Sequence, residues 1–153
     1  MGRPCRLVVV GDGPARAAAE RLAGRLIPGR AEFLGWQDSA EPYYAGAAML
    51  AVPSLWPEPS GNVGLEAMAR GLPVVAYRSG GIPEWLVDGQ TGLLAEPGDV
   101  WGLARNIELL LAEPGLARQL GEAGRERQRE RFGAERHVRR LEEILGEAVA
   151  APR

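Results

Sequence analysis

The stretch VPSLWPEPSGNVGLEAMARGLPVV, residues 52–75, determines how the rest of the chain is interpreted. It joins a short apolar strand end, a proline-rich loop that carries Glu58, a helix that carries Glu66 and a second apolar run. Because the loop leads straight into the helix, unpaired backbone N–H groups and the positive end of the helix dipole should face the loop. A phosphate suits that position, and carboxylates on both sides of it would accept hydrogen bonds from hydroxyl groups. Together these features predict a site for a nucleotide sugar.

Each of the two glutamates also has a simpler explanation. A glutamate near a helix N-terminus stabilises the helix by roughly 0.3 to 1 kcal/mol, and either residue could be ordinary surface charge. The pair favours a binding site, because nothing structural requires carboxylates on both sides of one anion-binding turn.

Length and composition limit the class of protein. The chain has 153 residues, of which 46 % are hydrophobic, a size and composition that predict one compact domain spanning residues 1–153. All basic residues are arginines and the net charge is −2, so there is no general electrostatic reason to expect binding to nucleic acid or to acidic membranes. One cysteine, Cys5, excludes an internal disulfide and a cysteine-based metal site. With no signal-peptide pattern and no run long enough for a transmembrane segment, we expect a cytoplasmic protein.

Strands and helices alternate through the first two thirds of the chain. The expected strands are residues 7–10, 31–34, 48–53, 73–77 and 91–95. This alternation predicts an α/β fold, a Rossmann-like doubly wound parallel sheet of about five strands, in residues 1–112, followed by a helical region in residues 113–153. The first strand is a continuous β-branched run, which predicts burial on both faces. Ligands of such sheets bind at the carboxyl ends of the strands, which include the loops at 11–14, 35–38 and 53–62.

Other motifs are less specific. Gly11 and Gly13 match the first two glycines of a dinucleotide fingerprint, but Arg16 stands in place of the third, so a tight turn and a phosphate-approaching loop are equally good interpretations. Trp36 lies on a ligand-side loop, although tryptophans pack in cores more often than they line sites. His137 lies among arginines on a charged helix and is expected to be a surface residue.

The strings VVVGDGP, EFLGW, VPSLWPEPSGNVGLEAMARGLPVVAY and SGGIPEWLVDGQTGLLAEPGD, with the closing ERF, together resemble the C-terminal, donor-binding half of glycosyltransferase family 4. These are the group 1 glycosyltransferases of the GT-B fold. The resemblance implies that Glu66 holds the ribose hydroxyls of the donor, and that Glu58 acts as the catalytic residue by holding the hydroxyls of the donor sugar.

The resemblance implies further donor-binding residues, which are distributed over two loops. The diphosphate and sugar would meet the backbone of Gly61, Asn62 and Val63. The Trp36–Gln37 turn would meet the nucleotide base. Gly11 and Gly13 are added as donor-binding residues on a separate ground, the strand pairing predicted below, which would bring their loop beside the Glu58 loop.

The chain also departs from the family pattern. Ser60 replaces a common phenylalanine and Asn62 a usual apolar residue, and both lie beside the donor sugar, whose identity stays open. The family's preceding strand, GRL-like loop, Arg/Lys pair and N-terminal acceptor-binding domain have no counterpart in the sequence. Losing the two cationic hydrogen bonds would weaken donor binding by about a hundredfold to ten-thousandfold. We therefore expect this chain to need the N-terminal acceptor-binding domain or a second chain, and not to be active alone.

The absent strand has a topological consequence. In a sheet ordered 3-2-1-4-5-6 it would be central, so its loss predicts the order 2-1-3-4-5, with the strand at 7–10 paired directly to the strand at 48–52. The final helices are expected either to cover the core or to offer an apolar face to another chain.

The sequence thus predicts the donor-binding domain of a retaining, metal-independent glycosyltransferase that transfers a hexosyl unit from a UDP- or GDP-sugar to an acceptor, without a cofactor or metal site. The alternative is a non-catalytic nucleotide-sugar-binding or assembly module with the same fold. A sugar-nucleotide epimerase of similar architecture is disfavoured, because the motifs match family 4 in particular.

Overall fold

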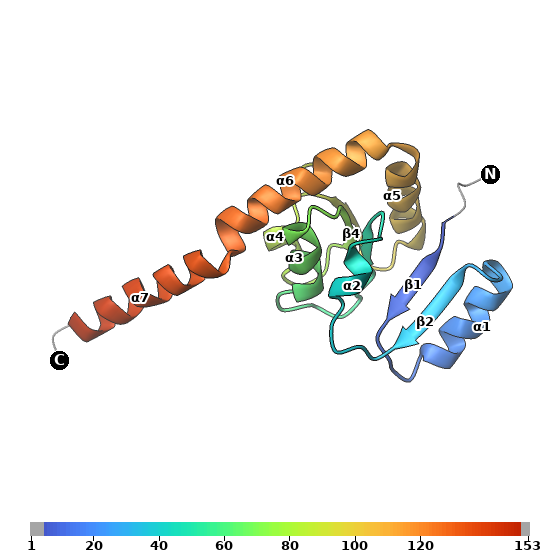
Figure 1. Cartoon of the computed structure of the whole chain (residues 1–153), viewed down its shortest axis with the longest axis horizontal. Helices are drawn as coiled ribbons and strands as arrows, with labels where there is room; N and C mark the ends of the chain where they lie inside the picture. The colour runs from blue at the N-terminus through green and yellow to red at the C-terminus, as the bar shows by residue number, and fades with distance from the viewer. Residues whose placement is uncertain (1–4, 151–153) are drawn as a thin grey trace. The chain divides into compact units, whose positions relative to one another are not determined.

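The computed structural model describes residues 5–150 and divides into two compact units, residues 1–46 and 47–153 (Figure 1). Both units contain parallel strands connected through helices. The α/β class predicted from the sequence is therefore confirmed.

The first unit is a β-α-β arrangement followed by a short helix. Its elements are β1 (Leu7–Val10), α1 (Arg16–Leu26), β2 (Ala31–Gly35) and α2 (Glu41–Tyr44). β1 and β2 pair in parallel, with Val9 opposite Phe33. α2 is one turn long, and the Ser39 hydroxyl accepts a hydrogen bond from the Glu41 N–H at its start, 3.1 Å away. The N-cap residue is Ala40, which makes no side-chain cap, so this bond satisfies one of the N–H groups that the helix start leaves unpaired.

β1 is more exposed than its sequence predicts. Leu7, Val8 and Val10 are 43 %, 42 % and 37 % exposed, so the expectation of burial on both faces was wrong. Within its own unit β1 belongs to a two-stranded sheet with one long helix, α1, and such a sheet has no second covering layer. A β-branched run indicates a strand, but it does not reveal how many layers cover that strand.

The second unit holds a three-stranded parallel sheet and most of the helices. Its elements are β3 (Leu50–Val52), α3 (Asn62–Ala69), β4 (Val74–Tyr77), α4 (Ile82–Trp85), β5 (Leu93–Ala95), α5 (Val100–Ala112), α6 (Pro114–Phe132) and α7 (Ala134–Ala150). The strand order is β3-β4-β5, and every residue of the central strand β4 is buried. A cluster of Val75, Leu93, Leu110 and Leu120 joins the sheet to α5 and α6.

Glycines let α6 pass close to the end of α3. Gly71, directly after α3, has φ +72°, a left-handed conformation that is typical of the residue following a helix. A Cβ on Gly121 of α6 would lie only 2.1 Å from the Gly71 carbonyl oxygen. The small residue at 121 therefore permits backbone contact between the two segments.

The helical region expected at 113–153 consists of α6 and α7, which are separated at Gly133, and Glu113 separates α6 from α5. All side chains of α7 that the structure describes are exposed, and His137 is among them, as expected. Within residues 5–150, no helix is both long enough and apolar enough to cross a membrane.

The predicted strand order 2-1-3-4-5 can be compared with the structure within each unit. β1 pairs with β2 in the first unit, and the order in the second unit is β3-β4-β5, which agrees with the 2-1 and 3-4-5 parts of the predicted order. The direct pairing of the strand at 7–10 with the strand at 48–52 would join the two units and stays a prediction. The single domain of residues 1–153 that the length predicts stays a prediction.

Candidate functional site

In the second unit, the loop between β3 and α3 carries Glu58. This carboxylate is half-buried, and the hydroxyl of Ser54 donates a hydrogen bond to its Oε1 atom over 2.8 Å. The bond uses one carboxylate oxygen and fixes the side chain, while the second oxygen keeps its capacity to accept a hydrogen bond.

The loop that follows β4 fixes the backbone on both sides of Pro57. The Ser79 hydroxyl donates to the Trp56 carbonyl at 2.9 Å, and the Gly81 N–H donates to the Glu58 carbonyl at 2.7 Å. Gly80 has φ +55°, and a Cβ there would lie 2.4 Å from the Glu58 carbonyl oxygen. Only glycine allows this approach, so the position of Glu58 depends on the Ser79–Gly81 turn.

The start of α3 is built to attract an anion. Gly61, its N-cap residue, has φ +64° and offers no side chain to cap the helix, and the first turn contains no acidic residue in the described structure. The Ser60 hydroxyl lies 3.0 Å from the Asn62 Oδ1 atom, so these exposed side chains interact with each other rather than with the helix N-terminus. The positive end of the helix dipole is left without a local counter-charge.

The Trp85 indole packs against the first turn of α3. Its side chain is 2 % exposed, and a Cβ on Gly64 would lie 2.1 Å from the indole ring. The ring also lies under Gly61, at 3.2 Å from the position of a Cβ there. The first turn of α3 therefore rests directly on an aromatic ring, which restricts where its amide groups can point.

Glu66 lies further along the same helix. Its side chain is exposed, and its carbonyl oxygen accepts a hydrogen bond from the Arg70 guanidinium at 2.9 Å. The structure thus brings Glu58, the Gly61–Val63 segment and Glu66 into one loop-and-helix element, as the sequence predicts; their roles toward a ligand remain predictions.

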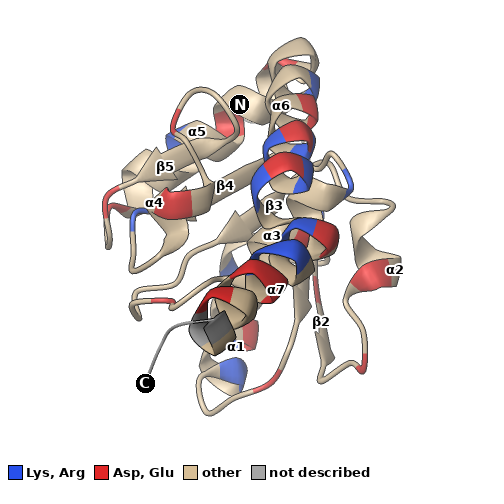
Figure 2. Ribbon diagram, turned by 90° about the vertical axis from the view of Figure 1, so that its left-hand side faces the viewer, with Lys and Arg blue, Asp and Glu red and all other residues tan. Residues whose placement is uncertain are grey.

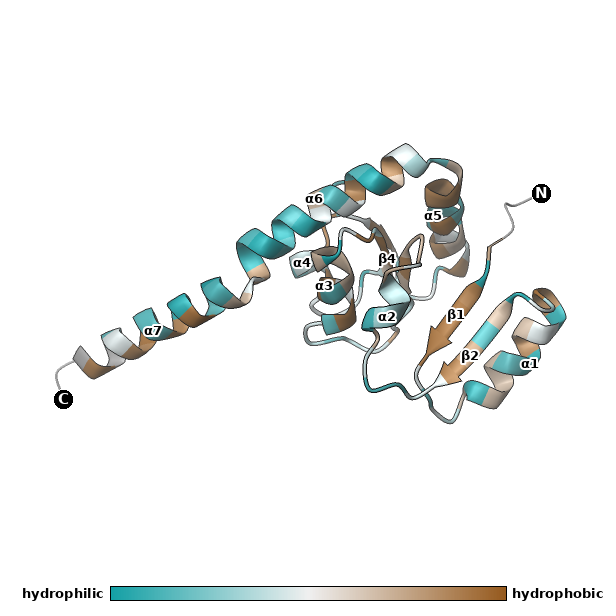
Figure 3. Ribbon diagram, in the orientation of Figure 1, coloured by the Kyte–Doolittle hydropathy of each residue, from teal (hydrophilic) through white to brown (hydrophobic). Residues whose placement is uncertain are grey.

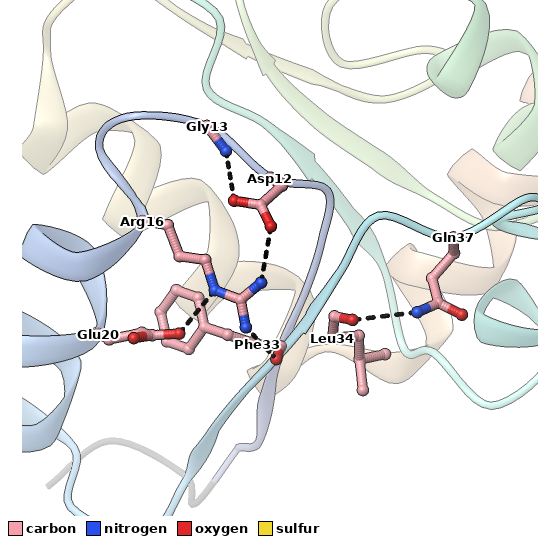
Figure 4. Close-up of polar contacts among 7 residues, drawn as sticks. All are labelled: Asp12, Gly13, Arg16, Glu20, Phe33, Leu34 and Gln37. Carbon is pink, nitrogen blue, oxygen red and sulfur yellow. Dashed lines mark hydrogen bonds and ion pairs between the residues drawn. The ribbon is translucent and has the colours of Figure 1, made fainter.

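The first unit contains a polar network around Arg16 (Figure 4). Its guanidinium donates to Asp12 at 2.9 Å, to Glu20 at 2.8 Å and to the Phe33 carbonyl at 3.2 Å, which ties α1 to β2. The backbone N–H of Gly13 donates to Asp12 at 2.7 Å. This hydrogen bond, followed by the one from Arg16, lowers the pKa of Asp12. Arg16, which replaces the third glycine of the fingerprint, therefore orders the turn as an ion-paired residue.

Trp36 and Gln37 also lie in the first unit. Trp36 is 78 % exposed, so it does not serve as core packing in this unit. The Gln37 amide donates to the Leu34 carbonyl at 3.0 Å and accepts from the Tyr43 hydroxyl at 2.9 Å (Figure 4 shows the first of these bonds). With its side chain held in this way, Gln37 offers a ligand its backbone more readily than its amide. Gly11, with φ +124°, and Gly13 both have open space around them.

Sequence reasoning missed Ser54, Ser79, Gly80 and Trp85. Ser54 stands four residues before Glu58, a spacing that could have suggested the bond, whereas the other three act on residues at least twenty positions away. Across residues 5–150, no group of three or more His, Cys, Asp or Glu side chains is arranged to hold a metal ion.

The chain is similar in sequence to known glycosyltransferases. Residues 2–113 match the family described as glycosyl transferases group 1. The lipopolysaccharide core biosynthesis glycosyltransferase LpsE of Rhizobium meliloti is 43 % identical over 122 residues, which cover 78 % of this chain and 35 % of LpsE.

Two solved structures share the fold. Sucrose-phosphate synthase from Thermosynechococcus elongatus superposes with a TM-score of 0.85 at 36 % identity, over 96 % of this chain and 39 % of that protein. Anabaena HepE in complex with UDP-glucose gives a TM-score of 0.85 at 28 % identity, over 93 % of this chain and 41 % of HepE. The chain spans little more than a third of the length of these relatives, and it belongs to the group 1 glycosyl transferase family.

Proposed function

We propose that this chain binds the nucleotide-diphospho-sugar donor of a glycosyltransferase. The observation that supports this most directly is the fixed Glu58 loop leading into an uncapped α3 start, which combines a hydroxyl acceptor with an anion-binding helix end. The complex of HepE with UDP-glucose supports the choice of ligand class.

Each part of the element receives a role in this proposal. The backbone amides of Gly61, Asn62 and Val63 hold the diphosphate, the free oxygen of Glu58 accepts from a hydroxyl of the hexose, and Glu66 accepts from the ribose hydroxyls. Trp36 and Gln37 are proposed to contact the base. The donor is a UDP- or GDP-sugar, and Ser60 and Asn62 influence which sugar is accepted.

The reaction proposed for the whole enzyme is hexosyl transfer with retention and without a metal. The bond between the anomeric carbon and the diphosphate breaks, and a bond to the acceptor oxygen forms on the same face of the sugar. The acceptor's proton leaves with the nucleoside diphosphate, so no oxidant or cofactor is required. Electrostatic stabilisation of the departing diphosphate is the main demand on the protein, and the α3 amides supply part of it.

Acceptor binding is assigned to a partner. Because the chain spans little more than a third of its relatives' length, we propose that an N-terminal acceptor-binding domain or a second chain completes the enzyme.

Calorimetric titration of the chain with UDP and GDP tests the proposal. One of the two nucleotides should bind, and Glu66→Gln should weaken that binding about tenfold or more, because a hydrogen bond to a charged group is lost. Glu108→Gln on α5, an exposed glutamate outside the element, is the matched control and should bind like the unchanged chain. Equal binding by the Glu66 variant would refute its assigned role.

The second candidate is a non-catalytic nucleotide-sugar-binding or assembly module, which the partial coverage of the relatives also fits. Joining the chain to the remaining part of LpsE and assaying transfer separates the two. Transfer that Glu58→Gln abolishes supports the enzyme, whereas nucleotide binding without transfer supports the module.

A further inference from the structure

One arginine of α6 differs from its neighbours. Figure 2 shows basic and acidic residues interleaved along this helix, and Figure 3 shows the half that precedes α7 as hydrophilic. Arg125, Arg129 and Arg131 in this half are exposed, as expected of surface charge, whereas Arg127 is half-buried. The surroundings of Arg127 therefore need an explanation that those of the other three do not.

The Arg127 guanidinium holds the end of α4. Its Nε atom donates a hydrogen bond to the Trp85 carbonyl at 2.9 Å, and its Nη2 atom donates to the Glu84 carbonyl at 2.8 Å. The last carbonyl groups of a helix have no partner within it, so these bonds satisfy groups that α4 itself cannot. Burial, and after it the nearby positive charge of Arg131, lowers the pKa of Arg127. Both effects disfavour a cation here, and the two charge-assisted hydrogen bonds offset that cost.

Trp85 connects this end of α4 with the start of α3. The benzo end of its indole faces Gly64, and the edge that contains Nε1 faces Gly61, the N-cap residue of α3. Within the part of the chain that the structure describes, Nε1 is buried without a hydrogen-bond partner. Nε1–H is the one polar group of a tryptophan side chain, so packing and the main chain of Trp85 determine where the ring lies. Arg127 holds that main chain.

Residues 79–85 contact both parts of the proposed site. The first residues of this segment, Ser79 and Gly81, donate to carbonyl groups of the loop before α3, whereas the Trp85 ring packs against the start of α3. The bonds of Ser79 and Gly81 do not involve Arg127. Loss of Arg127 should therefore disturb the helix start more than the loop.

We propose that Arg127 is a positioning residue for the anion-binding turn at residues 61–63, and that it acts through the main chain and ring of Trp85. The assignment of a diphosphate to this turn rests on the proposed function, and Arg127 raises the affinity for that diphosphate without touching it. Removing the guanidinium frees the end of α4, so the ring is held less firmly against Gly61 and the amide groups of the turn become less ordered. Fixed donors bind an anion more tightly than mobile ones, because binding does not first have to order them.

Amide NMR of the ligand-free chain tests the positioning by itself. Arg127→Ala should shift or broaden the resonances of residues 61–63 and of the Trp85 indole N–H. Arg129→Ala removes an exposed arginine of the same helix and is the matched control, which should leave these resonances unchanged. Arg127→Lys keeps a cationic donor without the fork that bonds two carbonyl groups at once, so its changes should be smaller than those of alanine. The lysine variant also serves if the alanine variant does not fold.

Titration with UDP and with uridine measures the consequence for binding. Arg127→Ala should bind UDP about tenfold more weakly than the unchanged chain does, and Arg127→Lys should regain part of that loss. Uridine should bind both variants like the unchanged chain, because the nucleoside is assigned to Glu66 and to the Trp36–Gln37 turn. A residue that only stabilised the fold would lower the midpoint of urea unfolding and leave the affinity of the folded chain unchanged.

A double-variant cycle tests the route through Trp85. Trp85→Phe shortens the ring that packs against α3 and keeps the main chain that Arg127 holds. In the Trp85→Phe background, Arg127→Ala should lower UDP affinity by less than about threefold, because the ring that transmits its effect is already reduced. Trp101→Phe changes an exposed tryptophan of α5 and is the control background, in which the tenfold loss should persist.

Three results would overturn the proposal. They are ligand-free resonances of residues 61–63 that Arg127→Ala leaves unchanged, a loss of UDP affinity that Arg129→Ala produces equally, and losses that simply add in the Trp85→Phe background. If the unchanged chain itself does not bind UDP, the proposed function is refuted instead, and the ligand-free spectra still decide whether Arg127 positions the turn.

Discussion

Gly64 is a residue of α3 at which the structure leaves no room for a side chain. A Cβ there would lie 2.1 Å from the Trp85 indole, which is itself buried and cannot move away without disturbing its surroundings. Gly64→Ala should therefore lower the free energy of unfolding by about 1 to 3 kcal/mol, measured by urea denaturation.

Gly115→Ala in α6 is the matched control. Nothing lies within 4 Å of a Cβ at that position, so alanine should keep or raise stability by up to about 1 kcal/mol. If the two variants are equally stable, the close packing of Gly64 against Trp85 does not determine stability at this position.

Ser54 offers a test of how Glu58 is held. Ser54→Ala removes the hydroxyl that donates to the Glu58 carboxylate at 2.8 Å, and the side chain should become less ordered. We expect UDP-glucose to lose about twofold to tenfold in affinity while UDP alone is unaffected, because Glu58 is assigned to the sugar. Calorimetry with both ligands measures the difference, and Ser39→Ala is the control. An equal loss for UDP would contradict the assignment.

At this scale the sequence reveals carboxylates and glycines but not their partners. Glu58, Gly61 and Glu66 can be proposed from the sequence, because their spacing within one segment has a chemical meaning. Ser79 and Trp85 could not, because their contacts with residues 56, 61 and 64 arise only when the β4–α4 segment packs beneath the loop.

At the scale of single elements, the turn from β1 into α1 depends on charge. The pKa of Asp12 is lowered from its ordinary value of 3.8, first by the Gly13 N–H and then by Arg16. A group with a lowered native pKa stabilises the fold above its unfolded pKa, and this contribution disappears as pH falls through the native pKa.

Asp12→Asn should therefore reduce the thermal stability of the chain at neutral pH and have progressively less effect below pH 3.8. Melting curves followed by circular dichroism between about pH 7 and about pH 2 check this convergence. A difference in melting temperature between the variant and the unchanged chain that stays constant over the whole pH range would show that the charge of Asp12 does not stabilise the fold. Asp38→Asn is a suitable control, because Asp38 is exposed in the same unit.

Local sequence signals predict most of the helices and strands. The wrong predictions concern where a strand ends and whether other elements bury it. Gly71, Pro114 and Gly133 stand at helix boundaries in the structure, and glycine and proline are the residues that local sequence rules favour at such positions. The strand expected at 48–53 shortens to Leu50–Val52, and β1 is exposed where burial was expected. Periodicity reports which residues prefer a strand, whereas strand length and burial depend on neighbouring elements.

At the scale of the whole molecule, the sequence predicts the parallel α/β class and the strand neighbours within each unit, whereas the pairing of β1 with β3 stays a prediction. Alternating strands and helices imply parallel pairing, and both β1–β2 and β3–β4–β5 are parallel. The order 2-1-3-4-5 assumed that two strands adjacent to a missing one would pair directly. Nothing in residues 7–10 or 48–52 encodes that pairing, because hydrogen-bonded edges carry no side-chain signature.

The central claim is that the Glu58 loop and the start of α3 hold a nucleotide-diphospho-sugar. Backbone amide NMR during titration with UDP-glucose tests it directly, since a phosphate at the helix start must change the environment of the amides it contacts. The account predicts the largest shift changes at Gly61, Asn62 and Val63, and smaller ones at Glu66. Changes confined to the arginine-rich helices α6 and α7, or no changes at millimolar ligand, would contradict it.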